Sequence, residues 1–212
     1  MIYRIVCRVL PLVMIVTLLA GCRSKKDNVQ PDIRIEEVAE NVAPWRNVYL
    51  PVKVELLSPK RFAMSGRATM VWNESIYLSM RMFGFEVGTA YADSSEAVVT
   101  LRQPQKVMIE LPLSDLLKKH DVEVAVLQQA MLGSREALAL LPSAIRWQAD
   151  SDERKSEVML SAVYKGKEVA VKLTWDLGAA QWNMDDVRRW SPPGADYRRL
   201  SVESAMKIME SL

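Results

Sequence analysis

The chain has 212 residues, of which 50% are hydrophobic and 25% are charged, and its formal net charge is +2. This composition excludes a disordered or collagen-like chain and allows one sizeable hydrophobic core. So small a net charge argues against electrostatic binding of nucleic acid, and we expect no nucleic-acid partner. Both cysteines, Cys7 and Cys22, lie near the N-terminus. A disulfide or a thiolate metal site in the rest of the chain is therefore excluded.

The first 21 residues have the pattern of a secretory signal peptide. Arg4 and Arg8 give this segment a positively charged start, and residues 9–20 form an apolar run. The run is shorter than the roughly 20 residues that a helix needs to cross a bilayer, so we do not expect a permanent span. Removal of the segment takes the 28 basic residues to 26, which equals the number of acidic residues.

The apolar run ends in Leu19-Ala20-Gly21-Cys22, which resembles the lipobox of bacterial lipoproteins. The resemblance implies that Cys22 is acylated and becomes the first residue of the mature chain, which is then tethered to the membrane by its acyl chains. An ordinary signal peptide that happens to contain a cysteine is the alternative. Arg23 stands where an aspartate would resemble the inner-membrane retention signal of enteric bacteria. We therefore expect an anchor in the outer membrane of the cell envelope. Export to the cell surface is the alternative, but the acidic run that directs some lipoproteins there is reduced to Asp27, so we expect the chain to face the periplasm.

Three regions are predicted along the chain: a signal peptide over 1–21, the acylated cysteine with a flexible tether over 22–32, and a single domain over 33–212. The tether is polar and has no apolar periodicity. A short amphipathic helix is predicted over Ile35–Val42 at the start of the domain.

From Val48 onwards the hydrophobic residues alternate with polar ones, which predicts β-strands. Pro51 marks the first of these as an edge or bulged strand, because proline cannot donate a ladder hydrogen bond. In the fourth strand the inward residues are predicted to be Phe85, Val87, Thr89 and Tyr91. Six strands of an antiparallel meander are predicted over 48–56, 62–72, 75–82, 85–91, 97–101 and 107–111.

A helical region follows the meander and is then followed by more strands. Helices are predicted over 113–133, ended by Gly133, and over 135–141. Further strands are predicted over 145–149, 158–164, 169–175, 180–184 and 197–201, with a C-terminal helix over 202–209. The expected fold class is mainly β (α+β), with about ten antiparallel strands and a few short helices.

Antiparallel strands with a helical interlude after the sixth, on an acylated N-terminus, resemble the half-barrel of the LolA and LolB superfamily of lipoprotein carriers and receptors. A closer resemblance is to a family of envelope lipoproteins of Bacteroidetes that is known only as a domain of unknown function. The residues that carry it are Ser75-Ile76-Tyr77-Leu78-Ser79, Phe83-Gly84-Phe85-Glu86-Val87 and Leu127-Gln128-Gln129-Ala130-Met131-Leu132-Gly133.

The resemblance implies a concave apolar sheet, partly plugged by helices, that holds a lipid or the acyl chain of another lipoprotein. Several of the inward residues are methionines, whose flexible side chains suit an adaptable apolar surface. An ordinary, fully packed core is the alternative for the same residues. The predicted groove residues are Met64, Met70, Leu78, Met80, Val87 and Val99, with Val126 and Met131 on a helix that acts as a movable plug.

The resemblance also implies an apolar residue on a protruding loop, and Phe83-Gly84-Phe85 at the turn between the third and fourth strands is the candidate. If Phe83 points outward, it can insert into a membrane or a partner. The alternative is that both rings fold back onto the sheet while Gly84 supplies the turn.

No motif for catalysis is recognised, and the one histidine, His120, lies in a basic stretch at a predicted helix end. We therefore expect no enzymatic activity, no catalytic residue, no metal and no cofactor. The leading hypothesis is a monomeric, noncatalytic lipoprotein that binds a lipid or an acyl chain. The alternative is a structural or assembly lipoprotein that holds an envelope protein complex in place through its outer surface.

Overall fold

The computed structural model of the chain describes residues 45–58, 61–102, 106–164, 166–187, 190–201 and 204. The predicted signal peptide, Cys22, the tether and the helix Ile35–Val42 lie outside the described residues. So does the predicted C-terminal helix over 202–209, apart from Ser204.

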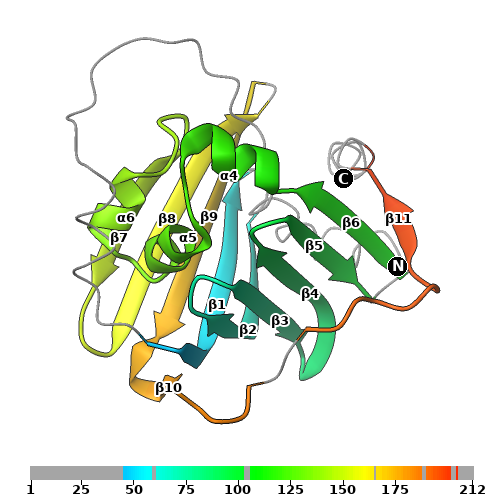
Figure 1. Cartoon of the computed structure of the whole chain (residues 1–212), viewed down its shortest axis with the longest axis horizontal. Coiled ribbons are helices and arrows are strands. Elements are labelled where there is room, and N and C mark those ends of the chain that lie inside the picture. The colour runs from blue at the N-terminus through cyan, green and yellow to red at the C-terminus, as the bar shows by residue number, and fades with distance from the viewer. Residues whose placement is uncertain are drawn as a thin grey trace.

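Within the described residues, eleven strands form one open sheet with a few helices (Figure 1). The strand order is β11-β6-β5-β4-β3-β2-β1-β9-β8-β7, and β10 pairs with β1 off this path. Every pair is antiparallel except β11 with β6. The mainly β fold class and the six-strand meander are confirmed. The strands are β1 (Asn47–Ser58), β2 (Phe62–Val71), β3 (Ser75–Met82), β4 (Phe85–Asp93), β5 (Glu96–Leu101), β6 (Val107–Pro112), β7 (Arg146–Ser151), β8 (Lys155–Tyr164), β9 (Lys167–Asp176), β10 (Gln181–Trp182) and β11 (Arg198–Leu200).

One face of the sheet carries the hydrophobic core, as the alternation in the sequence predicts. In β1 every second residue from Val48 to Leu56 is buried, while Lys53 on the other face is exposed. Cross-strand pairing continues this face from β1 to β2 and β3, since Leu50 is opposite Ala68 and Ala68 is opposite Leu78. The prediction of half-buried strands is correct here because the alternation is local to each strand.

The prediction that Pro51 marks an edge or bulged strand is wrong for the edge strand, because β1 lies inside the sheet between β2 and β9. β1 does have a register shift with β9, but it lies between Leu56 and Ser58, away from Pro51. On one side Pro51 pairs with Arg67 of β2. On the other side, β10 pairs with β1 as far as Tyr49, and β9 begins to pair at Val52. Pro51 falls in the interval between these two partners. A central strand therefore tolerates proline here, because no ladder donor is required at that position.

The predicted inward set of β4 is correct only at Val87: Phe85 is exposed, and Thr89 and Tyr91 lie on the other face. The register between β3 and β4 shifts at Met80 and Arg81, so that Val87 is an extra residue in β4. This bulge turns the following residues over, because a shift of one residue exchanges the two faces of a strand. Thr89 consequently lies on the face opposite the core, where its hydroxyl oxygen is 2.6 Å from that of Thr100. Tyr91 lies on the same face as Thr89.

The helices α4 (Ser114–His120), α5 (Val124–Met131) and α6 (Arg135–Ala139) lie over β1, β9, β8 and β7 on one face of the sheet (Figure 1). The predicted helical region over 113–133 is divided in two at Asp121, which adopts the left-handed conformation with φ of 52° and caps α4. A short 3-10 helix, η1 (Leu177–Ala179), follows β9. In the part of the chain described, no helix is long and apolar enough to cross a membrane.

Two contacts attach the segment before β11 to the rest of the sheet. The Trp190 ring stacks on Tyr91 of β4, with the ring centroids 4.2 Å apart. The Lys106 ammonium pairs with the Asp196 carboxylate. These contacts explain how three residues of β11 find a parallel place beside β6 at the sheet edge.

Candidate functional site

The structure brings the eight predicted groove residues into one hydrophobic core. All six strand residues are at least nine-tenths buried, and the α5 residues Val126 and Met131 are half-buried and packed against the same core. Burial of this kind is what ordinary core residues show. In this conformation the groove is closed, so a ligand can reach those strand residues only if the overlying chain moves away. The six are Met64, Met70, Leu78, Met80, Val87 and Val99.

Polar contacts hold the first half of α5 on the turn between β2 and β3. The side chain of Gln128 is fully buried, and its Nε2 donates to the carbonyl oxygens of Val71 and Ser75, at 2.7 and 3.0 Å. Its Oε1 accepts a hydrogen bond from the backbone N–H of Asn73 at 3.0 Å. Asn73 Oδ1 in turn accepts from the N–H of Ala125 at 3.1 Å. The turn therefore supplies the cap that the α5 N-terminus lacks from its own residues.

The end of α5 is held as firmly as its start. The indole N–H of the fully buried Trp175 donates to the carbonyl oxygen of Met131. The Ser156 hydroxyl donates to the carbonyl oxygen of Leu132 at 2.7 Å. Movement of the predicted plug must break these hydrogen bonds and those of Gln128, each of which leaves a buried polar group unsatisfied unless water or a ligand replaces it. The movable plug stays a prediction.

The predicted protruding loop lies at the tip of the β3–β4 hairpin, and its rings do not fold back onto the sheet. The exposed fractions are 82% for Phe83 and 77% for Phe85. They are the most exposed large hydrophobic side chains of the described residues. Phe85 pairs with the half-buried Met82, so the apolar tip is continuous with the edge of the core.

The backbone at this tip is unfavourable for the residue that occupies it. Phe83 has φ of 51° and Gly84 has φ of 83°, the combination found in tight hairpin turns that favour Asn-Gly. The other described non-glycine residues with positive φ are asparagine or aspartate: Asn73, Asp121 and Asn183. A bulky side chain in this conformation costs about 1–2 kcal/mol. Phe83 is thus both strained and exposed, and folding gains little from its ring.

Below the tip, Glu86 joins the two strands and a neighbouring loop. Its carboxylate accepts a hydrogen bond from the Ser79 hydroxyl at 2.6 Å and forms an ion pair with Arg102 at 2.7 Å. Arg81, opposite Glu86 in the register, is exposed. The part of the hairpin next to the tip therefore carries two guanidinium groups and one carboxylate. The contacts of Glu86 hold in place the two strands that present the phenylalanines.

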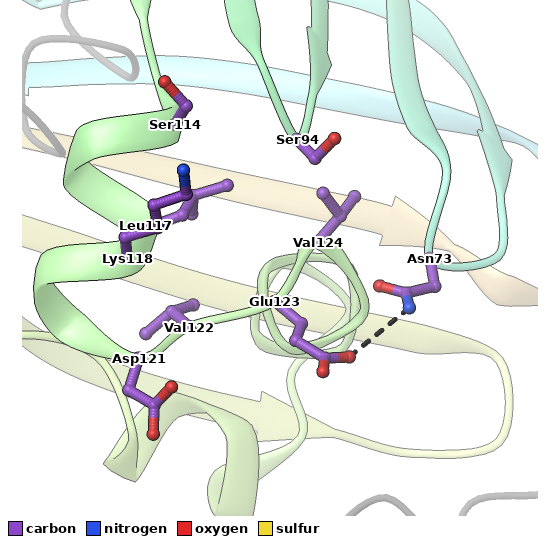
Figure 2. Close-up of a pocket in the computed structure, with 9 residues that line it drawn as sticks. All are labelled: Asn73, Ser94, Ser114, Leu117, Lys118, Asp121, Val122, Glu123 and Val124. Carbon is purple, nitrogen blue, oxygen red and sulfur yellow. Dashed lines mark hydrogen bonds between the residues drawn. The ribbon is translucent and has the colours of Figure 1, made fainter.

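A hollow of about 350 Å³ lies at the other end of the same hairpin, between α4 and the turns that follow β2 and β4 (Figure 2). Sequence reasoning missed it, because its walls come from segments far apart in the chain. The available signal was helical spacing: Ser114 and Lys118 share one face of α4. The lining residues are Asn73, Ser94, Ser114, Leu117, Lys118, Asp121, Val122, Glu123 and Val124.

No group of three or more potential metal ligands occurs among the residues that the structure describes. His120 lies at the end of α4, and burial together with the charge of Lys119 lowers the pKa of its imidazole. Its Nε2 is buried without a hydrogen-bond partner. No catalytic role was predicted for this residue, and that stays a prediction.

Comparison with known proteins gives a distant likeness in structure alone. No protein-family model matches the chain, and no curated protein matches it. An uncharacterized conserved protein from Thermus thermophilus aligns over 79% of this chain and 96% of its own, with 7% identity and a TM-score of 0.36. An SsgA-like sporulation-specific cell division protein from Thermobifida fusca aligns over 62% of this chain and 73% of its own, with 8% identity and a TM-score of 0.25.

Proposed function

We propose that the chain is an outer-membrane-anchored periplasmic lipoprotein with a LolA/LolB-like half-barrel, which binds a lipid or the acyl chain of a lipoprotein without catalysing a reaction. The anchor in this proposal is the acylated Cys22. The observation that carries the proposal is the tip formed by Phe83, Gly84 and Phe85, which is exposed, apolar and strained.

The tip supports lipid contact because two exposed phenylalanines on a strained turn contribute little to the fold but can bind an apolar partner. Burying a phenylalanine side chain contributes about 2 kcal/mol or more, and two rings on one turn reach the same apolar phase together. The tip has no fixed polar pattern that a specific protein surface would have to match. The guanidinium of Arg81 beside it favours the anionic head groups of a lipid surface.

The closed core sets a condition on the acyl-binding part of the proposal. An acyl chain enters the core only if a covering element such as α5 moves away, and the hydrogen bonds that Gln128 and Trp175 make are then exchanged for contacts with the ligand. An acyl chain replaces the apolar contacts of α5 at roughly 0.8 kcal/mol for each buried methylene. A long acyl chain can therefore compensate for the hydrogen bonds and apolar contacts that α5 loses.

The test uses the full acylated chain, purified in mild detergent, and a fluorescent diacylated lipopeptide whose binding is followed by anisotropy. A variant carrying Phe83→Asn and Phe85→Ser should bind the lipopeptide at least about tenfold more weakly than the wild type, because two apolar contacts are lost. The control is Val163→Ser, which removes another exposed apolar side chain, 59% exposed, from β8. Equal binding by the double variant, or no binding by the wild type, would contradict the proposal.

The structural or assembly lipoprotein is the second candidate, and the closed core favours it. A scaffold needs no open groove, and it can use the same phenylalanine tip to dock into a protein. A photo-crosslinking residue at position 83 separates the two functions in cells. One stoichiometric protein adduct supports the scaffold, whereas adducts with lipids and with many lipoproteins support the carrier.

A further inference from the structure

We infer that the hollow at the base of the β3–β4 hairpin binds a small zwitterion with a free amino group and a free carboxylate, of about the size of a dipeptide. The volume of about 350 Å³ lies at the lower end of the range for small-molecule sites. This inference concerns a separate site and does not rest on the lipid-binding proposal.

The hollow has an apolar floor and polar walls. Leu117, Val122 and Val124 are buried residues that line it and pack into the hydrophobic core. The walls are α4, the β2–β3 turn and the β4–β5 turn, from which polar side chains extend around the space (Figure 2). An apolar floor below a few convergent polar groups is the usual construction of a site for a small ligand.

Lys118 and the Ser114 hydroxyl suit the carboxylate of the ligand. Ser114 lies one turn before Lys118 on α4, and Ser94 lies across the hollow on the β4–β5 turn, with its hydroxyl turned away from α4 (Figure 2). Within the described residues, these three side chains have no hydrogen bond or ion pair, so their donors are available. An ammonium group with a hydroxyl donor is a suitable set for a carboxylate, since charge-assisted hydrogen bonds are the stronger ones.

The carboxylate of Glu123 suits the amino group of the ligand. Asn73 Nδ2 donates to Glu123 Oε2 at 3.3 Å, which positions the Glu123 carboxylate and leaves its other oxygen available (Figure 2). Asp121, a second lining residue, adds negative charge at the end of α4. The Glu123 carboxylate therefore has a defined place on the wall.

The presence of both charges determines the class of ligand. A simple anion that contacts Lys118 would face the two carboxylates, and a simple cation beside Glu123 would face Lys118. A molecule with one group of each sign avoids both repulsions, which is how opposed charges produce specificity. A short peptide with free ends has this chemistry and adds small apolar side chains for the floor.

The test measures binding of Ala-Ala to the full chain in mild detergent by isothermal titration calorimetry. We expect saturable binding with a Kd at or below about 1 mM, and binding at least about tenfold weaker for N-acetyl-Ala-Ala and for Ala-Ala amide. Lys118→Gln should weaken Ala-Ala binding and remove the discrimination against the amide. Glu123→Gln should weaken binding and remove the discrimination against the acetylated peptide.

The matched controls are Lys119→Gln and Asp115→Asn, which remove the same charges from α4 at positions outside the hollow. Both should bind Ala-Ala as the wild type does, and circular dichroism should give the same fold for all four variants. The inference is overturned if the wild type shows no saturable binding up to about 10 mM. It is also overturned if the blocked peptides bind as well as Ala-Ala, or if the control variants lose binding as the lining variants do.

Discussion

The two ends of the β3–β4 hairpin differ in how well their residues suit the backbone conformation. At its base, the turn at Asn73 and the turn at Asp93 carry polar residues whose side chains satisfy neighbouring backbone groups. At its tip, Phe83 occupies a left-handed position that favours asparagine, and its ring is exposed. The base has residues that its backbone requires, and the tip has a residue that its backbone disfavours.

We interpret the difference as one between residues suited to folding and residues suited to contact, the role proposed above for the tip. Local preference and tertiary structure agree at the base, where Asn73 adopts a conformation common for asparagine and also caps α5. At the tip they conflict, and conflicts of this kind concentrate at functional positions. The following substitutions test whether the two ends have these two roles.

The largest effect is expected from Gln128→Leu, which removes the contact between the base and α5. The substitution leaves the N–H of Asn73 and the carbonyl oxygens of Val71 and Ser75 without these partners in a partly buried place. We expect the free energy of unfolding to fall by about 3 kcal/mol or more, measured by urea denaturation. Gln148→Leu, at an exposed position of β7, is the control and should change stability little. Equal effects of the two substitutions would show that the Gln128 contacts do not hold the base.

Asn73→Ala should have the next largest effect. Alanine loses both the cap on Ala125 and the ease with which asparagine adopts positive φ. We expect a loss of about 2 kcal/mol in the free energy of unfolding. Asn183→Ala tests positive φ at a position that does not cap a helix, although Asn183 Oδ1 accepts from the N–H of Arg46. A larger loss at Asn183 than at Asn73 would argue against the capping role.

Phe83→Asn should change stability in the opposite direction. Asparagine suits the turn, and little packing is lost with a ring that is 82% exposed. We expect the protein to gain about 1 kcal/mol in the free energy of unfolding while its lipopeptide binding falls. Urea denaturation and the anisotropy assay measure the two changes on one sample. A loss of stability would mean that the ring contributes to the fold, and the contrast between base and tip would then fail.

The smallest effect concerns alkaline pH at the base. Burial, the hydrogen bond to Asp93 and the charge of Asp93 raise the pKa of Tyr91 to about 12 from its ordinary value of 10.0. Because the folded state holds this proton more tightly, its contribution to stability is present below pH 10 and is lost as the pH rises toward about 12. Tyr91→Phe should therefore lose less stability over this interval than the wild type, measured by urea denaturation. Tyrosinate absorbance should also show one fewer tyrosine of high pKa in that variant.

The sequence predicts the strands well because alternation is a local property. The alternation from Val48 to Leu56 is enough to recognise a half-buried strand without knowing which strands lie beside it. The place of β1 in the sheet was not predictable, because the rule for Pro51 assumes a continuous partner, and here the partner changes from β10 to β9. The bulge at Val87 has one signal in the sequence, because Gly88 follows it inside the strand, but a lone glycine does not say which residue is the extra one.

The candidate sites depend more on tertiary structure. Gly84 indicates the turn, so the position of the phenylalanine tip was predictable, but the exposure of its rings depends on what packs beside them. Gln128 resembles a surface residue in its sequence context, yet it is fully buried because two strand carbonyls need donors. The hollow depends on three distant segments meeting, and no local pattern contains that information.

The place of β1 between β2 and β9 also determines how the chain can reach its fold. The meander β1 to β6 can form from neighbouring segments, but the seam of Val52 with Trp175 joins residues that are far apart in synthesis. Contacts between residues far apart in the sequence slow folding, because the chain must lose the entropy of closing the long loop before the contact can stabilise it. A chain that emerges from its N-terminus therefore exposes the apolar edge of β1 until β9 is complete. A chaperone that shields extended apolar segments should speed its folding more than that of a simple meander.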